Sequence, residues 1–190
     1  ISLFFSVPTA YKKILSYLET RSRVEQEEFK KKMQEHIRLF ISGSSAMPVP
    51  ILEAFEAKSG KKLLERWGMT EIGMGLSQSY FEPEKRIPGT VGLPLPTVEV
   101  KLRSSSSSSD GEQQQDQEKE TTNSTSNNDL LVRSGSMFSR YWGKEHKTID
   151  AFIEDPETPG KFWFDTGDSV RRILDEENAL LRRPLLHPCG

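Results

Sequence analysis

A hydroxyl and a carboxylate stand side by side near the middle of the chain, at Thr70 and Glu71, inside the stretch LLERWGMTEIGMGLS. Three glycines lie close around this pair. Glycine lets the backbone approach a ligand without a Cβ clash, a hydroxyl can donate to an anionic oxygen, and a carboxylate suits a hard cation. A strand end whose threonine caps the next turn would have the same pattern. The pair alone favours the cap, so its meaning depends on other segments.

Three further segments are candidates to meet this pair: ISGSSAMP (Ile41–Pro48), PGTVGLPLP (Pro88–Pro96) and FDTGD (Phe164–Asp168). The first follows an apolar run, at a predicted strand end, where open α/β sheets bind ligands. The last ends in an aspartate, and the two oxygens of an ionised carboxylate suit a vicinal diol. Considered singly, each segment is an ordinary loop or turn.

Alternating helices and strands are predicted to position the first of these segments. In order, we expect a buried strand over Ser2–Val7, an amphipathic helix between Val24 and Phe40, a strand at Leu39–Ser42, a helix from about Pro48 to Gly60, and a strand in KKLLERWG. The amphipathic helix rests on apolar residues that recur at spacings of three and four, with polar residues between them. Such alternation indicates an α/β fold, in which a βαβ layer carries a largely parallel sheet.

After Gly75 the pattern changes to short β-type runs separated by proline and glycine, which predicts a small, β-rich, barrel-like subdomain. Between Arg103 and Asp129 no side chain is aliphatic or aromatic. Ordering that segment would cost entropy with no apolar burial to offset it, so we expect a disordered insert. Near the end, DEEN is either a turn between two strands or part of a short helix, ILDEENALL.

Composition excludes several classes of protein. The chain has 26 basic and 28 acidic residues, a formal charge of −2, which gives no reason to expect a nucleic-acid partner or an anionic membrane. The single cysteine, Cys189, cannot form a disulfide within the chain and favours a reducing compartment. No apolar run approaches the ~20 residues of a membrane span. The apolar start, ISLFFSVPTA, lacks the basic segment of a signal peptide, so we expect a piece of a longer, non-secreted protein.

The four polar segments, in this order over Ile41–Asp168, resemble the adenylate-forming enzymes, which include acyl- and aryl-CoA synthetases, luciferases and peptide-synthetase adenylation domains. WGMTE is similar to that family's aromatic-Gly-x-Thr-Glu signature, and FDTGD is similar to its aromatic-x-Thr-Gly-Asp signature. GMTEIGM followed by RIPGTVGLPLP resembles the malonyl-CoA synthetase branch. Near the start, VPTAYKKIL resembles a Val-Pro-Thr-aromatic segment of the family.

The resemblance implies an ATP-dependent acid–CoA ligase that activates a carboxylic acid, here malonate, as acyl-AMP and passes it to coenzyme A. Thr70 and Glu71 would be catalytic, with Glu71 also a ligand of Mg²⁺. The residues expected to bind the nucleotide are Gly43, Ser44, Ser45, Ala46, Trp67, Gly68, Met69, Thr70 and Asp168. Among them, the ring of Trp67 would lie on adenine, and Asp168, aimed by a turn at Thr166 and Gly167, would hold the ribose.

Arg86 is the predicted ligand of the second carboxylate of a dicarboxylic acid, because a guanidinium can bind a carboxylate through two parallel hydrogen bonds. The alternative is a surface arginine paired with Glu82 or Glu84. The aromatic segment YWGKEHKTIDAF, Tyr141–Phe152, is assigned to packing. The three histidines have no ligand spacing.

Within the same resemblance, residues 1–77 would be the second half of the α/β nucleotide-binding lobe. Residues 78–170 would be the β-rich subdomain, with the insert at 104–128, and residues 171–190 a divergent tail. The sequence contains neither the family's phosphate loop nor its lysine-bearing C-terminal lid, so this chain alone is expected to be inactive. Other interpretations are a medium-chain or aromatic acyl-CoA synthetase, or an inactive nucleotide-binding remnant. Either a mitochondrial or a cytoplasmic location is compatible with the sequence, and the oligomeric state stays open.

Overall fold

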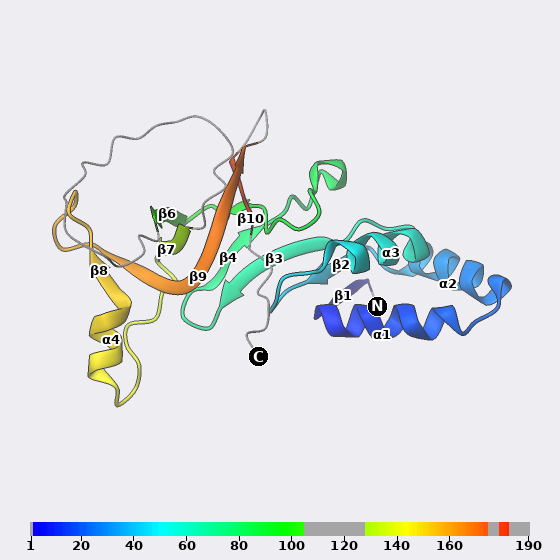
Figure 1. Ribbon diagram of the computed structural model, residues 1–190, viewed down its shortest axis with the longest axis horizontal. Coiled ribbons are helices and arrows are strands. Elements are labelled where there is room, and N and C mark those ends of the chain that lie inside the picture. The colour runs from blue at the N-terminus through cyan, green and yellow to red at the C-terminus, as the bar shows by residue number, and fades with distance from the viewer. Residues whose placement is uncertain (1, 105–127, 175–178, 183–190) are drawn as a thin grey trace.

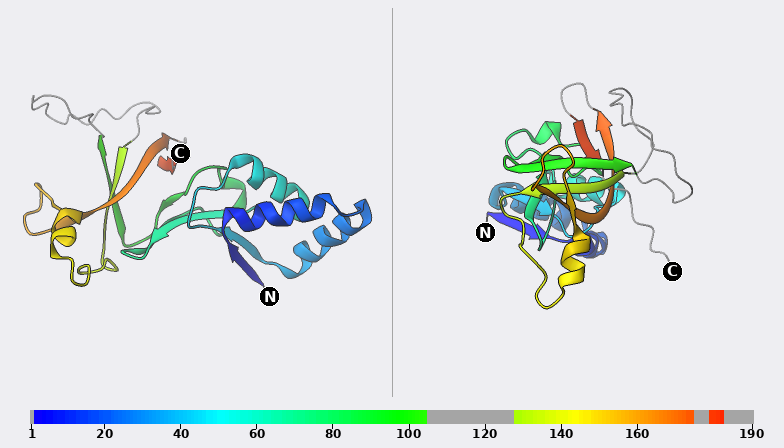
Figure 2. Two further views of the ribbon diagram at one scale, coloured as in Figure 1. Left: turned by 60° about the horizontal axis from the view of Figure 1, so that its bottom comes forward. Right: turned by 90° about the vertical axis from the view of Figure 1, so that its left-hand side faces the viewer.

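The computed structural model describes residues 2–104, 128–174 and 179–182, and it contains two five-stranded sheets (Figure 1). The strand order is β1-β2-β3-β4-β5 in the first sheet and β10-β9-β7-β6 in the second, where β8 also pairs with β9. Three helices gather beside β1 and β2 at one end of the molecule, and the second sheet lies at the other end (Figures 1 and 2). The β3–β4 hairpin runs between them.

The first sheet is parallel where helices connect its strands and antiparallel where short turns do. Its strands are β1 (Leu3–Ser6), β2 (Leu39–Ser42), β3 (Leu64–Met69), β4 (Gly73–Ser77) and β5 (Leu93–Pro94). Strands β1, β2 and β3 pair in parallel, whereas β4 and β5 continue the sheet in antiparallel pairing. The predicted βαβ layer is therefore confirmed. Because Ser42 pairs with Glu65, β3 continues beyond the end of β2 toward the Thr-Glu pair.

The helices are α1 (Pro8–Glu19), α2 (Arg23–His36) and α3 (Val49–Ser59). Sequence analysis missed α1, although Tyr11 and Leu18, two of its buried residues, are spaced as one face of a helix requires. Helix α2 ends at His36 rather than near Phe40, because Ile37 is already extended and Phe40 belongs to β2. Helix α3 is confirmed, and Gly60 ends it at a φ of 68°, a left-handed conformation that favours glycine.

An aromatic core fixes α1 and α3 to the parallel strands. Tyr11 and Phe40 each make an edge contact with Phe55, at ring distances of 4.8 and 5.0 Å, and the hydroxyl of Tyr11 donates to the carbonyl of Ile41 at 2.7 Å. The prediction that the first strand is buried needs correction. Strand β1 pairs only with β2 among the described residues, and Phe5, on its other face, is 52% exposed.

The second sheet is antiparallel and curled, as predicted for a barrel-like subdomain (Figure 2). Its strands are β6 (Val98–Ser104), β7 (Asn128–Ser134), β8 (Phe152–Glu154), β9 (Phe162–Leu174) and β10 (Ala179–Arg182), and α4 (Glu145–Ala151) precedes β8. A short 3-10 helix, η1 (Pro83–Lys85), lies between β4 and β5. Because β9 pairs with β10, the two-strand interpretation of the tail is correct. The insert at 105–127 and the DEEN segment lie outside the described residues.

The two sheets share one hydrophobic core. Residues Trp67, Ile72 and Leu76 of the first sheet pack with four buried residues of the second, Leu130, Val132, Phe164 and Val170. This shared core fixes the carboxyl end of β3 against the middle of β9. The segments WGMTE and FDTGD lie at that junction.

Candidate functional site

A hydrogen bond joins the two signature segments directly. The indole Nε1 of Trp67 donates to Oδ2 of Asp168 at 2.6 Å, across 101 positions of sequence. Trp67 lies on β3, three residues before Thr70, and Asp168 lies in the middle of β9. The structure therefore brings the Thr-Glu segment and the TGD segment to one place, as their family resemblance requires.

The predicted adenine-stacking role of Trp67 needs correction. The residue is only 3% exposed, and its ring packs inside the shared core. A Cβ built on Gly75 would lie 2.7 Å from the indole ring, so the opposite strand covers the ring closely. The part of Trp67 that acts at the site is the N–H that orients Asp168.

Asp168 is positioned by a bulge rather than by the predicted turn. Strand β9 continues through the segment, but the five residues of β9 from Asp165 to Ser169 face only three residues of β7, Asp129 to Leu131. Gly167 has a φ of 69°, which permits the irregularity. The hydroxyl of Thr166 donates to the carbonyl of Leu130 at 2.8 Å and accepts the backbone N–H of Asp168 at 3.1 Å. These bonds turn the aspartate toward Trp67.

Thr70 and Glu71 form the turn between β3 and β4. The hydroxyl of Thr70 makes no hydrogen bond with any part of the chain that the structure describes, so it does not act as the cap that the dipeptide alone suggests. Glu71 is half-buried, and its Oε1 accepts the hydroxyl of Tyr141 at 2.9 Å. Its backbone carbonyl accepts the N–H of Phe138 at 2.7 Å. Two residues between β7 and α4, Phe138 and Tyr141, thus hold the turn through Glu71, and the hydroxyl of Thr70 stays exposed.

Tyr141 is a site residue that sequence analysis assigned to packing. The pKa of the Tyr141 hydroxyl is raised, mainly by burial and to a smaller extent by the hydrogen bond to Glu71. The group therefore stays protonated at neutral pH and donates to the carboxylate. The neighbouring Trp142 is 89% exposed and anchors nothing in the described structure. No spacing in the sequence could reveal the contact, because 70 positions separate Tyr141 from Glu71.

The loop from Gly43 to Ala46 follows β2 and lies beside β3. Gly43 is buried, and a Cβ there would lie 3.2 Å from the ring of Phe5 and 3.6 Å from the carbonyl oxygen of Arg66. The next residue, Ser44, is exposed and has a φ of 69°, an uncommon conformation outside glycine. The two serine hydroxyls of this loop therefore face solvent at the carboxyl edge of the parallel strands.

Gly68 has a different structural role from the expected one. A Cβ at Gly68 would clash with the carbonyl oxygen of Gly73, and the β3–β4 register shifts between Trp67 and Gly68. The close approach that requires glycine is thus made by the hairpin itself. Met69, the next residue, packs at the border of the shared core.

The prediction that Arg86 is open to a substrate carboxylate is wrong. Arg86 is 6% exposed, and its guanidinium donates to three backbone carbonyls: Ser79 at 2.9 Å, Lys62 at 2.8 Å and Tyr80 at 3.2 Å. Lys62 precedes β3, so this cluster lies at the end of the strand opposite to Thr70. The surface alternative is wrong as well, since burial lowers the pKa of Arg86 and Glu82 pairs with Lys85 instead. Arg86 therefore has a structural role, because it joins the chain before β3 to the chain before η1.

A buried polar network, also missed from the sequence, holds the PGTVG segment. Glu65 is 4% exposed and accepts the N–H of Gly89 at 3.0 Å. Gln78 accepts the N–H of Glu65 at 3.0 Å and donates to the carbonyls of Ile87 and Thr90. Burial raises the pKa of the Glu65 carboxyl to about 7. The network ties the segment after η1 to the β3–β4 hairpin.

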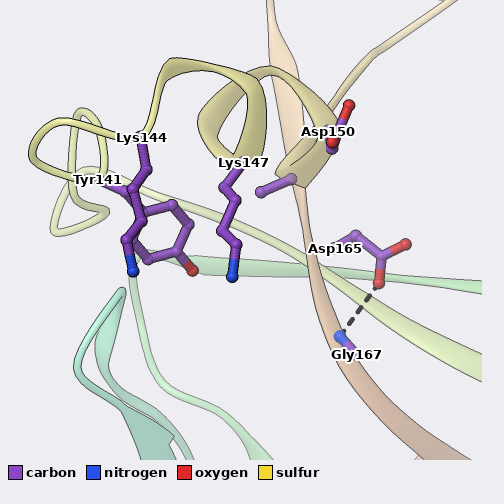
Figure 3. Close-up of a pocket in the computed structure, with 7 residues that line it drawn as sticks. Tyr141, Lys144, Lys147, Asp150, Asp165 and Gly167 are labelled. Atoms are coloured by element: carbon purple, nitrogen blue, oxygen red, sulfur yellow. Dashed lines mark hydrogen bonds between the residues drawn. The ribbon is translucent and has the colours of Figure 1, made fainter.

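A groove of about 590 Å³ lies between α4 and the bulge of β9 (Figure 3). Its lining residues are Tyr141, Lys144, Lys147, Asp150, Ala151, Asp165 and Gly167. The groove touches both halves of the candidate site, because the Tyr141 hydroxyl binds Glu71 and Gly167 immediately precedes Asp168.

The residues of the site suit a Mg²⁺ ion that arrives with a nucleotide better than a metal ion coordinated by protein side chains alone. In the described ranges no three His, Cys, Asp or Glu side chains lie together as a metal site. Glu71 supplies one carboxylate, and Tyr141 binds only its Oε1. One carboxylate completed by phosphate oxygens and waters is an ordinary Mg²⁺ environment. Among the described residues, none of the helices combines the length and apolar character needed to cross a membrane.

Comparisons with known proteins identify the family of the chain. The profile of the AMP-binding enzyme family matches residues 1–142. The mitochondrial malonate–CoA ligase ACSF3 of Mus musculus is 41% identical over 180 residues, which cover 90% of this chain and 29% of the relative. The malonate–CoA ligase of Arabidopsis thaliana is 33% identical over 183 residues, which cover 96% of this chain and 26% of that relative. The chain thus spans less than a third of these relatives.

A solved structure gives the same result at the level of the fold. A malonyl-CoA ligase with methylmalonyl-CoA and AMP bound matches with a TM-score of 0.67 and 32% identity, over 96% of this chain and 33% of that chain.

Proposed function

The chain belongs to the family of AMP-binding enzymes, and we propose that it forms part of an ATP-dependent acid–CoA ligase. In this proposal the ligase activates a carboxylic acid as acyl-AMP and transfers the acyl group to coenzyme A. The observation that carries the proposal is the hydrogen bond between Trp67 and Asp168. It unites the two nucleotide signatures, while Tyr141 holds the Thr-Glu turn on the same side.

The proposed site must bring two anions together, so its work is positioning and charge compensation. The exposed Thr70 hydroxyl donates to an α-phosphate oxygen, because it has no other partner in the described structure. Asp168, fixed by Trp67 and the Thr166 bulge, accepts the ribose hydroxyls. Glu71 is held by Tyr141 with its Oε2 available to a cation. Mg²⁺, when bound, offsets phosphate charge. The serine loop after Gly43 borders the nucleotide and the acyl group.

Malonate is the proposed acid, and support for it comes from relatives named malonate–CoA ligases, in mouse at 41% identity and in a plant at 33%. Arg86 lends no support, because its guanidinium is occupied within the fold. A different acid, medium-chain or aromatic, is the alternative.

The mouse relative is named mitochondrial, and we extend that compartment to this chain as part of the proposal. Fractionation of native tissue, followed by detection of the protein with an antibody, would test it.

Calorimetry with non-hydrolysable acyl-AMP analogues tests the ligase proposal. We expect the 190-residue chain to bind a malonyl analogue, and Asp168→Ala to weaken binding at least tenfold through loss of charge-assisted bonds to the ribose. Glu84→Gln, which changes an exposed carboxylate on η1, should bind like the unmodified chain.

The results separate the alternatives. Absence of binding to every analogue would overturn the nucleotide site. Tighter binding of an octanoyl analogue than of the malonyl one would overturn malonate. Binding without pyrophosphate release, when ATP and malonate are added, is the result expected of an inactive remnant.

A further inference from the structure

We propose that Lys144 and Lys147 form a phosphate-binding site in the groove between α4 and β9, which takes a phosphate group of a nucleotide co-substrate. This inference rests on the proposed function and deepens it. Lys144 is the residue immediately before α4, and Lys147 lies in its first turn. Figure 3 shows both ammonium groups pointing to one side, where the hydroxyl of Tyr141 also lies.

The two lysines have no competing partner within the described ranges, where neither ammonium group forms a hydrogen bond or an ion pair. They are exposed, and their ammonium groups lie on the same side of the groove (Figure 3). Two like charges held on one side repel each other. A bound anion would remove that repulsion, and the compact ammonium of lysine is a common ligand for phosphate.

The acidic residues of the groove do not cancel this charge. Oδ2 of Asp165 accepts from Arg103 at 2.7 Å, and its Oδ1 accepts the N–H of Gly167 at 3.1 Å. Arg103, from β6, therefore offsets part of the charge of Asp165, and it also pairs with Asp129 at 3.0 Å. The carboxylate of Asp150 points away from the two ammonium groups (Figure 3). The side of the groove toward Tyr141 therefore carries two cations, against the one carboxylate of Glu71, whose Oε1 accepts the Tyr141 hydroxyl at 2.9 Å.

The groove is continuous with the proposed nucleotide site at two points. Tyr141 lines the groove and donates to Glu71 at 2.9 Å, and Gly167 lines it and is covalently joined to Asp168. A nucleotide held by Asp168 and the Thr-Glu turn would present its charged groups near the same hydroxyl. Both co-substrates of the proposed reaction carry phosphates, ATP in its triphosphate and coenzyme A in its pyrophosphate and 3′-phosphate.

The test is a binding comparison between Lys144→Gln/Lys147→Gln and a matched control, Lys12→Gln/Lys13→Gln. The control removes two exposed lysines from α1, so both variants change the net charge equally. The probes are pyrophosphate, ATP, AMP, coenzyme A and 3′-dephospho-coenzyme A, measured by calorimetry at low and high salt. Circular dichroism checks that both variants are folded.

We expect the groove variant to bind pyrophosphate about tenfold more weakly than the control, because it loses two exposed charge contacts. Its affinity should also depend less on salt concentration. If the groove variant binds ATP more weakly but AMP with unchanged affinity, the phosphate held in the groove belongs to the triphosphate. If it binds coenzyme A more weakly but 3′-dephospho-coenzyme A with unchanged affinity, the phosphate is the 3′-phosphate of coenzyme A. Equal affinities of the two variants for pyrophosphate, ATP and coenzyme A would overturn the phosphate site. If the acyl-AMP analogue still binds in that case, the ligase proposal survives.

Discussion

The ionisation of Glu65 should make the fold less stable as the pH rises. The carboxyl is 4% exposed, and burial raises its pKa from 4.5 to about 7, although backbone N–H groups of Gly89 and Met47 donate to it. The nearby carboxylate of Glu56 adds to the rise. In the unfolded chain these effects vanish, so the group ionises at the ordinary pKa.

The size of the effect follows from linkage. The difference between about 7 and 4.5 is 2.5 pKa units. At 1.36 kcal/mol for each unit it is worth about 3.4 kcal/mol of unfolding free energy. Because the folded-state pKa is the higher one, this stability is fully present below pH 4.5 and is lost as the pH rises through 7. By the same relation, about 2.5 kcal/mol of the loss falls between pH 5 and pH 8.

Glu65→Gln isolates this contribution, because the amide keeps the shape of the side chain and an acceptor oxygen but cannot ionise. Urea unfolding at pH 5 and pH 8 gives the free-energy change for each protein. The unmodified chain should lose about 2.5 kcal/mol more than Glu65→Gln over this range. Glu53→Gln, on the exposed side of α3, should behave like the unmodified chain. Equal losses in the Glu65→Gln variant and the unmodified chain would refute the reasoning.

Three other substitutions test the site and its supports. Arg86→Ala should lower the unfolding free energy by roughly 2–4 kcal/mol, because three backbone carbonyls lose their donor. An unchanged urea-unfolding curve would contradict this structural role of Arg86. Trp67→Phe keeps an apolar ring but removes the N–H that orients Asp168, so calorimetry should show about tenfold weaker binding of the acyl-AMP analogue, and unchanged affinity would argue against this orientation. Tyr141→Phe should cost about 1 kcal/mol of thermal stability through loss of the bond to Glu71, and an unshifted melting temperature would count against that bond.

Local signals in the sequence were sufficient for several elements of the parallel layer, among them β2, β3 and α3. The strand at Leu39–Ser42 and the end of α3 at Gly60 follow from short apolar runs and a left-handed glycine, which depend only on neighbouring residues. Helix α1 carried an equally local signal that was not used. The exposure of β1 depends on what lies beside the strand, and its apolar composition gives no information on that.

The side-chain environments of the site could not be predicted from local pattern. The register shift between Trp67 and Gly68 decides how the indole meets the opposite strand, and a strand pattern does not reveal such a shift. Arg86 finds its acceptors at Lys62 and on the chain just before η1, and no motif links these positions. By contrast, the family signatures were sufficient to bring Asp168 to the Thr-Glu segment.

A crystal structure of the 190-residue chain with AMP would test the central claim most directly. We expect the ribose hydroxyls to lie within hydrogen-bond distance of the Asp168 carboxylate, and the phosphate to lie within the same distance of the Thr70 hydroxyl. AMP bound elsewhere, or bound at one of these residues with its other end directed away from the second, would contradict a single nucleotide site at the junction of the two sheets.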